Sequence, residues 1–310
     1  MAFRLIKGSI ALTYYNGRLQ GSNPDGDSVW FKPNQRRNLQ KINGRSAKFN
    51  KGGFAQLRLE GIDALELHYK GSNHQAKVPT LAARDFLLSE LGFKTSKIEY
   101  APSQHIPARV RRSAPKSVVA HIYVRSIDPF GRPVAFLFAG YTKTKDGSDV
   151  FVPAARFKNS VNGKLMLAGH VYPGYYSGRF VNEQIKGGLP AGIRDQLTKL
   201  KLQAQKQRHG LWPQDASVKG FKLQSGDNLQ EIVIWPKLYR RLFVYYFKSS
   251  VIHPTLKGFI DWLRENKSQQ NDKIYDIESG ELRNLSDFLT MSGKKLKLSQ
   301  DPQNLLIVPT

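Results

Sequence analysis

The chain contains no cysteine, and this absence excludes both disulfides and metal centres held by thiolates. No stretch approaches the roughly 18 consecutive apolar residues that a membrane-spanning helix needs. The first residues also lack the apolar run and the small-residue cleavage site of a signal peptide. We therefore expect a cytoplasmic protein with no membrane segment. A secreted protein would follow only if the N-terminus of the sequence had been trimmed.

Acidic side chains are scarce, since 24 Asp and Glu stand against 48 Lys and Arg, for a net charge of +24. Residues 218–310 hold 14 basic and 10 acidic residues, so residues 1–217 hold the other 34 and 14. Polyanions are the natural partners of such a chain, because phosphates bound by Lys and Arg release their counterions. A basic surface without a dedicated ligand is the alternative. Residues 28–51 contain no acidic residue, and from them we take Arg36, Arg37 and Lys48 as candidate nucleic-acid contacts.

Hydrophobic patterning divides the chain into two parts. A length of 310 residues with 40% apolar content suggests one large or two ordinary domains. Polar and small residues gather near 215–227, and we place a boundary there between a domain over 1–217 and an α+β module over 218–310. We assign no role to the second module, although a protein partner or control of the first domain would fit it.

Local patterns predict the elements of both parts. In the first part we expect strands over 10–15, 28–31, 54–59, 118–127 and 134–138, and helices over 81–91, 160–168 and 194–208. In the second part we expect helices over 235–246, 256–264 and 284–291, and a strand over 305–308.

Three short motifs carry most of the functional information. They are Asp25-Gly-Asp27-Ser-Val, then Arg58 followed by Asp63 and Glu66, and then Asp128-Pro-Phe-Gly-Arg132. Each motif taken alone is typical of an ordinary polar turn. Their co-occurrence in this order resembles the thermonuclease (staphylococcal nuclease-like) family, and Val161-Asn162 and the helix that ends before Trp212 resemble later parts of the same family. The resemblance covers most of residues 1 to about 217 and does not extend further.

This resemblance implies a fold and a reaction. The fold would be α+β: an OB-type, five-stranded β-barrel packed against three helices, followed by the smaller C-terminal domain. OB barrels commonly bind nucleic acids on one face. The activity would be calcium-dependent, sugar-nonspecific hydrolysis of phosphodiester bonds in DNA and RNA, with single strands favoured and 3′-phosphates as products.

The family pattern also implies residue roles. Asp27 and Asp63 would ligate Ca²⁺, a cation that takes oxygen ligands. The backbone carbonyl of Ala64 would complete the set of protein ligands. Asp25 would lie next to these ligands without contacting the ion itself. The family usually has Thr-Pro where this chain has Ala64-Leu65, so the turn lacks the fixed φ of proline.

Glu66 would position or deprotonate the attacking water. Arg58 and Arg132 would bind the scissile phosphate, because the planar guanidinium suits bidentate contacts with phosphate oxygens.

Three tyrosines, Tyr172, Tyr175 and Tyr176, follow the helix that ends at Gly169, where the family carries tyrosines that contact nucleotides, and Tyr175 is the best positional match. Stacking on such rings would favour unpaired strands of any sequence, while packing between helix and barrel is the alternative role. For the whole protein the alternative is a nucleic-acid-binding protein that has a nuclease-like fold but no catalysis, or a nuclease gated by its C-terminal module.

Overall fold

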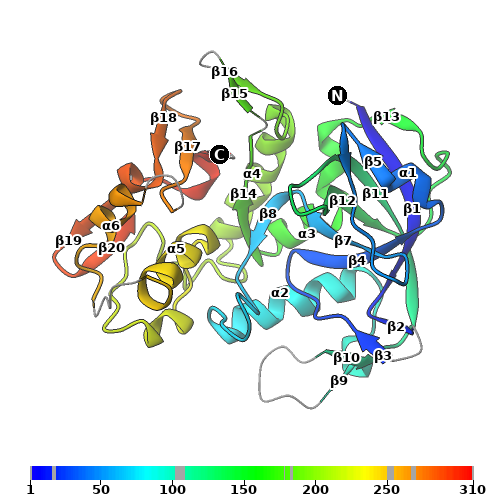
Figure 1. Cartoon of the computed structure of the whole chain (residues 1–310), viewed down its shortest axis with the longest axis horizontal. Helices are drawn as coiled ribbons and strands as arrows, with labels where there is room; N and C mark the ends of the chain where they lie inside the picture. Colours follow the sequence, from blue (N-terminus) through cyan, green and yellow to red (C-terminus); the bar gives the residue numbers. More distant parts are fainter. Residues whose placement is uncertain are drawn as a thin grey trace.

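A computed structural model describes residues 2–15, 19–101, 109–177, 179–181, 184–249, 255–266 and 270–308. The fold is mixed α+β and centres on a closed five-stranded barrel (Figure 1). The strand order is β11-β12-β7-β4-β1, and β1 pairs back onto β11 to close the barrel. The bounds are β1 Ala2–Ala11, β4 Ser28–Pro33, β7 Ala55–Leu59, β11 Ser117–Ile127 and β12 Pro133–Ala139.

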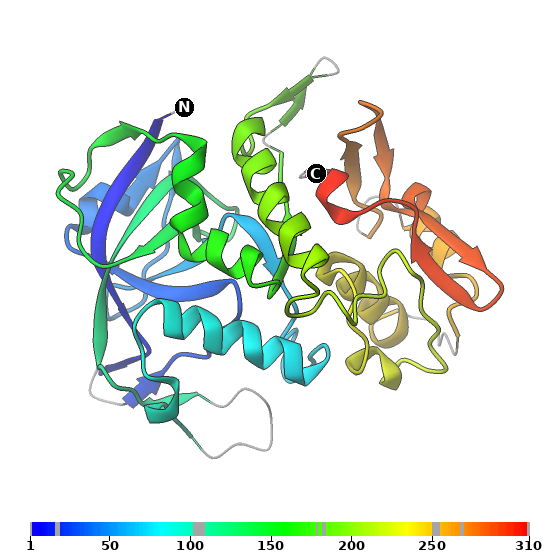
Figure 2. The ribbon, with the colours of Figure 1, turned by 180° about the vertical axis from the view of Figure 1, so that it is seen from behind.

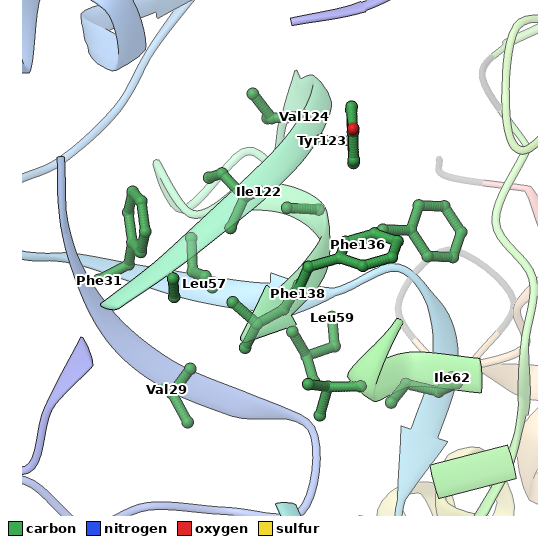
Figure 3. Packing of buried hydrophobic residues seen from close by; sticks show 14 of the residues in the cluster. Val29, Phe31, Leu57, Leu59, Ile62, Ile122, Tyr123, Val124, Phe136 and Phe138 are labelled. Carbon is green, nitrogen blue, oxygen red and sulfur yellow. The ribbon is translucent and has the colours of Figure 1, made fainter. Parts of the chain in front are cut away.

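Alternation of apolar residues explains the barrel interior. Along β7, Ala55, Leu57 and Leu59 are buried and the residues between them are partly exposed. These side chains belong to the same buried cluster as Phe31 and Phe136 of the neighbouring strands, and Figure 3 shows Leu57 and Leu59 in this cluster. All neighbouring strands of the barrel are antiparallel except β7 and β12, which run parallel and pair Arg58 with Val134. The barrel and four of its strands confirm the coarse fold prediction, whereas the first strand begins at Ala2 and ends at Ala11, earlier than the predicted range 10–15.

Three helices pack around the barrel, as predicted: α2 Lys77–Glu90, α3 Val161–Leu167 and α4 Ala191–Lys206. Ser160 caps α3 by accepting a hydrogen bond from the backbone N–H of Gly163. Gly92 and Gly169 follow α2 and α3 with positive φ, the conformation that glycine supplies at helix ends.

Gly61 begins β8, Gly61–Ala64, and fixes the path of the chain toward the candidate site. Its φ is +79°, and a Cβ atom there would lie 2.5 Å from Leu197 Cδ1 of α4. Glycine is therefore required both by the backbone conformation and by the close packing of the helix. Strand β8 pairs with β14, Val171–Gly174, so that Asp63 lies opposite Tyr172.

Short elements complete the first part of the chain, with β13 extending the barrel sheet at β1. They are β2 Thr13–Tyr15, β3 Leu19–Gly21, α1 Arg36–Gln40, β5 Lys41–Ile42, β6 Arg45–Ser46, η1 Thr95–Lys97, β9 Glu99–Tyr100, β10 Val110–Arg112, β13 Asp149–Phe151, η2 Ala154–Asn159, β15 Arg179–Val181 and β16 Gln184–Lys186.

The C-terminal part confirms two of its three predicted helices and the final strand. The third prediction, a helix over 284–291, is wrong. Asn284 and Asp287 form a capping box around a single 3₁₀ turn, after which the chain continues as a strand. The elements are η3 Asp227–Gln230, α5 Pro236–Phe247, α6 Phe259–Glu265, β17 Lys273–Asp276, β18 Leu282–Asn284, η4 Leu285–Phe288, β19 Leu289–Ser292, β20 Lys295–Leu298, η5 Pro302–Asn304 and β21 Leu305–Val308.

A second apolar cluster crosses the predicted boundary near 215–227. Leu65, Tyr172 and Trp212 from the first part pack in the same cluster as Trp235 and Tyr239 from the second. Figures 1 and 2 both show α5 beside β8 and α4, with the remaining C-terminal elements beyond it. The two parts therefore share a core in this structure. Among the described helices, none combines the length and the apolar character needed to cross a bilayer.

Candidate functional site

Two strands of the barrel, β4 and β7, and the following strand β8 bring five predicted site residues together. Asp25 and Asp27 lie in the turn before β4, Arg58 lies in β7, and Asp63 and Glu66 lie in β8 and just beyond it. The backbone N–H of Leu59 donates to the carbonyl of Asp27 at 2.9 Å, which ties the turn to β7. These side chains interact electrostatically with one another across the segments.

The two aspartates of the turn face strong negative charge. Burial and the nearby Asp63 carboxylate together raise the pKa of Asp27 to about 6, although Arg58 opposes the shift. Burial also raises the pKa of Asp25, with Asp27 and Glu66 adding to the effect. A proton bound to one of these carboxylates, or a cation bound between them, would relieve the repulsion. The turn is therefore a place where positive charge would be stabilised.

Arg58 is fixed between an aromatic ring and these acids. Its guanidinium lies over the ring of Tyr176, 4.3 Å from the centroid. Burial alone would lower the pKa of Arg58, but Tyr176, Asp63 and Asp27 raise it above its ordinary value. Burial alone would raise the pKa of Tyr176, but Arg58 and Lys237 bring it below its ordinary value. Arg58 thus stays charged at the centre of the site.

Arg240 of α5 also enters the site, although no motif in the sequence indicates it. Its Nη2 donates to Asp63 Oδ1 at 2.6 Å and its Nη1 donates to Asp63 Oδ2 at 3.3 Å. Its Nε donates to Glu66 Oε1. One guanidinium from the C-terminal part therefore holds the predicted metal ligand and the predicted water-positioning carboxylate.

Arg132 has a different partner in this structure. Its Nε donates to Asp128 Oδ2 at 2.7 Å, and its backbone N–H donates to Asp128 Oδ1 at 2.9 Å. The turn that carries it is closed by Gly131, which has a φ of +87°. Because Val134 pairs with Arg58, this turn lies at the same end of β12 as the site. The turn that carries Arg132 therefore lies near the strand that carries Arg58, and Asp128 orients the Arg132 guanidinium.

Tyr172 and Tyr175 lie in the core. Tyr172 is fully buried and donates to Asp215 Oδ1 at 2.7 Å, and Tyr175 is 1% exposed and donates to the carbonyl of Arg194 at 3.0 Å. Neither ring offers a face to a nucleotide base, so the expected stacking contacts do not hold in this conformation. The two rings take the packing role that the sequence left open. Tyr176 is the tyrosine of this segment that reaches the site.

The three basic candidates of residues 28–51 are exposed. Arg36 stacks on Phe49 at 4.5 Å from the ring centroid, and Arg37 donates to Gln35 Oε1 at 3.2 Å. The backbone N–H of Lys48 donates to the carbonyl of Gly131 at 2.9 Å, so Lys48 adjoins the turn of Arg132. Lys48 is therefore the one of these three that the structure places next to a predicted site residue.

The donor chemistry of the site fits a hard divalent cation, because carboxylate oxygens dominate and the charge on Asp25 and Asp27 is poorly compensated. Among the described residues, however, no three carboxylate or imidazole groups are already arranged to hold a metal ion. Asp63 is engaged by Arg240 at both oxygens. The residues fit calcium on the condition that Asp63 exchanges that partner.

Arg240 could not be recognised from the sequence, for a physical reason. It lies in the amphipathic run Leu238-Tyr-Arg-Arg-Leu, in which polar residues are typical of a solvated helix face. Two adjacent arginines occur there, and only the packing of α5 decides that Arg240 faces Asp63 while Arg241 faces Asp272.

Comparison with known proteins adds no relative, since neither a protein-family model nor a curated protein matches this chain.

Proposed function

We propose that the protein is a calcium-dependent, sugar-nonspecific nuclease that hydrolyses phosphodiester bonds of DNA and RNA on a staphylococcal nuclease-like barrel. The observation that supports this most is the convergence of five side chains from the turn before β4, from β7, and from β8 and the residues after it: Asp25, Asp27, Arg58, Asp63 and Glu66. Residues that serve only as solvated turn residues have no reason to gather around a partly buried guanidinium. The motif order in the sequence and the charge distribution of the site support the same activity.

Each side chain has a role that its surroundings suit. Arg58 would bind a non-bridging phosphate oxygen and the charge that grows on it in the transition state, since Tyr176 and the acids hold it in place. Arg132 would add a second guanidinium, with its plane set by Asp128. Glu66 would accept the proton of the attacking water, because it is the partly exposed carboxylate that follows β8.

Asp27, Asp63 and the carbonyl of Ala64 would hold the calcium ion, with Asp25 supporting Asp27. The ion would supply positive charge beside the scissile phosphate. Burial and neighbouring acids raise the pKa of both Asp25 and Asp27. A bound cation would stabilise the two carboxylates and so oppose this shift.

A negatively charged, extended substrate fits the rest of the surface. Arg36, Arg37 and Lys48 are exposed, and the excess of 34 basic over 14 acidic residues lies in residues 1–217. Backbone contacts of this kind do not select a sequence or a sugar. The family resemblance implies that single strands are favoured and that the products carry 3′-phosphates.

The test is cleavage of end-labelled single-stranded DNA and RNA by purified protein with calcium, with magnesium and with chelator. We expect calcium-dependent cleavage that Glu66→Ala abolishes. Arg132→Lys keeps the positive charge but loses the planar guanidinium that makes bidentate contacts. We expect a rate loss of roughly 100- to 1,000-fold. An Arg132→Lys protein with near wild-type activity would remove Arg132 from the proposed mechanism.

A non-catalytic nucleic-acid-binding protein is the second candidate, and one observation favours it. Asp63 and Glu66, which catalysis requires, are both paired with Arg240. This candidate predicts salt-sensitive binding of single strands with no cleavage under any metal condition. Binding without cleavage, by both the wild-type protein and a variant in which Arg240 is replaced, would establish it over the nuclease.

A further inference from the structure

Arg240 is the only residue of the C-terminal part that the described ion pairs connect to the acids of the site. It bridges two carboxylates at once, with two nitrogens on Asp63 and one on Glu66. Asp63 is fully buried, so its charge has little access to water as compensation. Burial alone would lower the pKa of Arg240, but Asp63 and Glu66 raise it well above its ordinary value. The guanidinium thus occupies the groups that the proposed function assigns to a cation and to water.

The position of Arg240 is built into the fold through the segment that follows Glu66. Gln75 accepts a hydrogen bond from the backbone N–H of Glu66 at 3.0 Å and donates to the carbonyl of Ile234 at 2.8 Å. Tyr239 donates to the carbonyl of His74 at 3.1 Å. Tyr69 packs edge-on against Phe243, with 5.2 Å between ring centroids. Helix α5 is therefore anchored to the site on both sides of Arg240, and this packing places the Arg240 guanidinium beside Asp63 and Glu66.

The charge of the site shows what this placement does. Four carboxyl groups, those of Asp25, Asp27, Asp63 and Glu66, gather with the guanidinium groups of Arg58 and Arg240. Arg240 therefore supplies one of the two positive charges that these arginines bring to the acids. Without Arg240 the cluster would lose that charge, and the attraction for a divalent cation would rise.

We propose that Arg240 is an internal competitor of calcium: it holds Asp63 and Glu66 in an inactive state, and the ion gains these groups only when the Arg240 side chain swings away. This regulation rests on the proposed nuclease function of the same site. The docked helix does not have to move, because the arginine side chain is long and its side chain is 20% exposed. The released guanidinium would then be available to a substrate phosphate, for which its geometry is suited.

The experiment measures calcium binding by the full-length protein with calorimetry, using calcium chloride as the titrant. Arg240→Gln removes the competitor. Arg241→Gln is the matched control, since Arg241 lies on the same helix, its side chain is 16% exposed, and it pairs bidentately with Asp272 at 2.7 and 2.8 Å. Arg240→Lys keeps a positive charge without the fork, and it is the second variant if the glutamine variant does not fold.

We expect Arg240→Gln to bind calcium about 10-fold more tightly or better, within the about 5- to 150-fold range usual for coupled sites. Arg240→Lys should give a smaller gain, and Arg241→Gln should leave the affinity unchanged. Calcium should also raise the melting temperature of Arg240→Gln more than that of the wild-type protein.

Calcium binding that is equal or weaker in Arg240→Gln would overturn the competition while leaving the nuclease proposal intact. An equal gain in Arg241→Gln would overturn it too, since the effect would then reflect loosening of α5. Absence of calcium binding in every protein would overturn both the competition and the calcium requirement of the proposed nuclease. A cleavage assay on the same samples separates these cases, because metal-independent cleavage would keep the hydrolytic activity.

Discussion

Asn162 supports the barrel wall behind the site, and its replacement gives the sharpest test of the packing argument. It is fully buried at the start of α3. Its Oδ1 accepts from the backbone N–H of Leu137 at 3.0 Å, and its Nδ2 donates to the carbonyls of Glu60 and Ala135 at 2.9 and 3.1 Å. Because β7 ends at Leu59, the side-chain amide takes the place of a neighbouring strand beside β12.

The expected cost of Asn162→Leu follows from these three bonds. The carbonyl of Ala135 keeps a partner, since it also accepts from the backbone N–H of Glu60 at 2.9 Å. Leu137 N–H and the carbonyl of Glu60 lose the amide, and a buried unsatisfied group costs about 1–3 kcal/mol. We therefore expect a loss of about 2–6 kcal/mol, a large share of the 5–15 kcal/mol typical of a domain.

Urea unfolding followed by tryptophan fluorescence measures this loss, with Asn73→Ala as the control. Asn73 is partly exposed and donates to the carbonyl of Lys70 at 3.3 Å, so its replacement should change stability by less than about 0.5 kcal/mol. Asn162→Asp should be at least as damaging as Asn162→Leu, because a carboxylate oxygen would face two carbonyls. A loss below about 1 kcal/mol for Asn162→Leu would refute the reasoning.

Two further predictions concern stability. Lys201 has no exposed side-chain surface and pairs with Asp301, which is 27% exposed and can regain water. We expect Lys201→Ala to cost about 3 kcal/mol in urea unfolding and Lys201→Met clearly less, since methionine fills the space; equal losses would show that packing is unimportant there. Burial lowers the pKa of His121, and Arg156 and Lys7 add to the effect although the carbonyl of Gly140 opposes it. The unfolded chain therefore takes up the proton first, so stability falls as pH drops below about 6.5. His121→Gln should lose less stability than wild type between pH 7 and 5 in urea titrations, and a parallel pH dependence of the two proteins would contradict this.

The sequence predicted the barrel because its strands carry local signals. Alternation along residues 54–59 and the apolar run over 118–127 are visible without any knowledge of pairing. Pattern alone placed the first strand too late, since polar residues Arg4 and Lys7 interrupt an otherwise buried strand that begins at Ala2. The predicted helix over 284–291 failed for a related reason, because a capping box can close a single turn as well as open a helix.

The site was predictable only where it is local in sequence. Asp25 and Asp27 precede β4, which pairs with β7 and so with Arg58. Asp63 and Glu66 follow β7 within a few residues along the chain, so the convergence follows from one strand pairing and a short connection. The partner of Asp63 lies 177 residues further along the chain, and no spacing rule reaches that distance. The burial of Tyr172 and Tyr175 depends in the same way on α4, Asp215 and the C-terminal strand, which pack over them.

Strand β21 contributes to the site and is made after all the other residues of the site. Ile307 donates to the carbonyl of Tyr175 and accepts from the backbone N–H of Ser177, which brackets the Tyr176 whose ring covers Arg58. A ribosome adds about 5–20 residues per second, so Arg240 is made several seconds before Ile307. Throughout that interval the growing chain has the barrel acids but lacks the strand that fixes Tyr176. The complete site is therefore acquired only after β21 has been made.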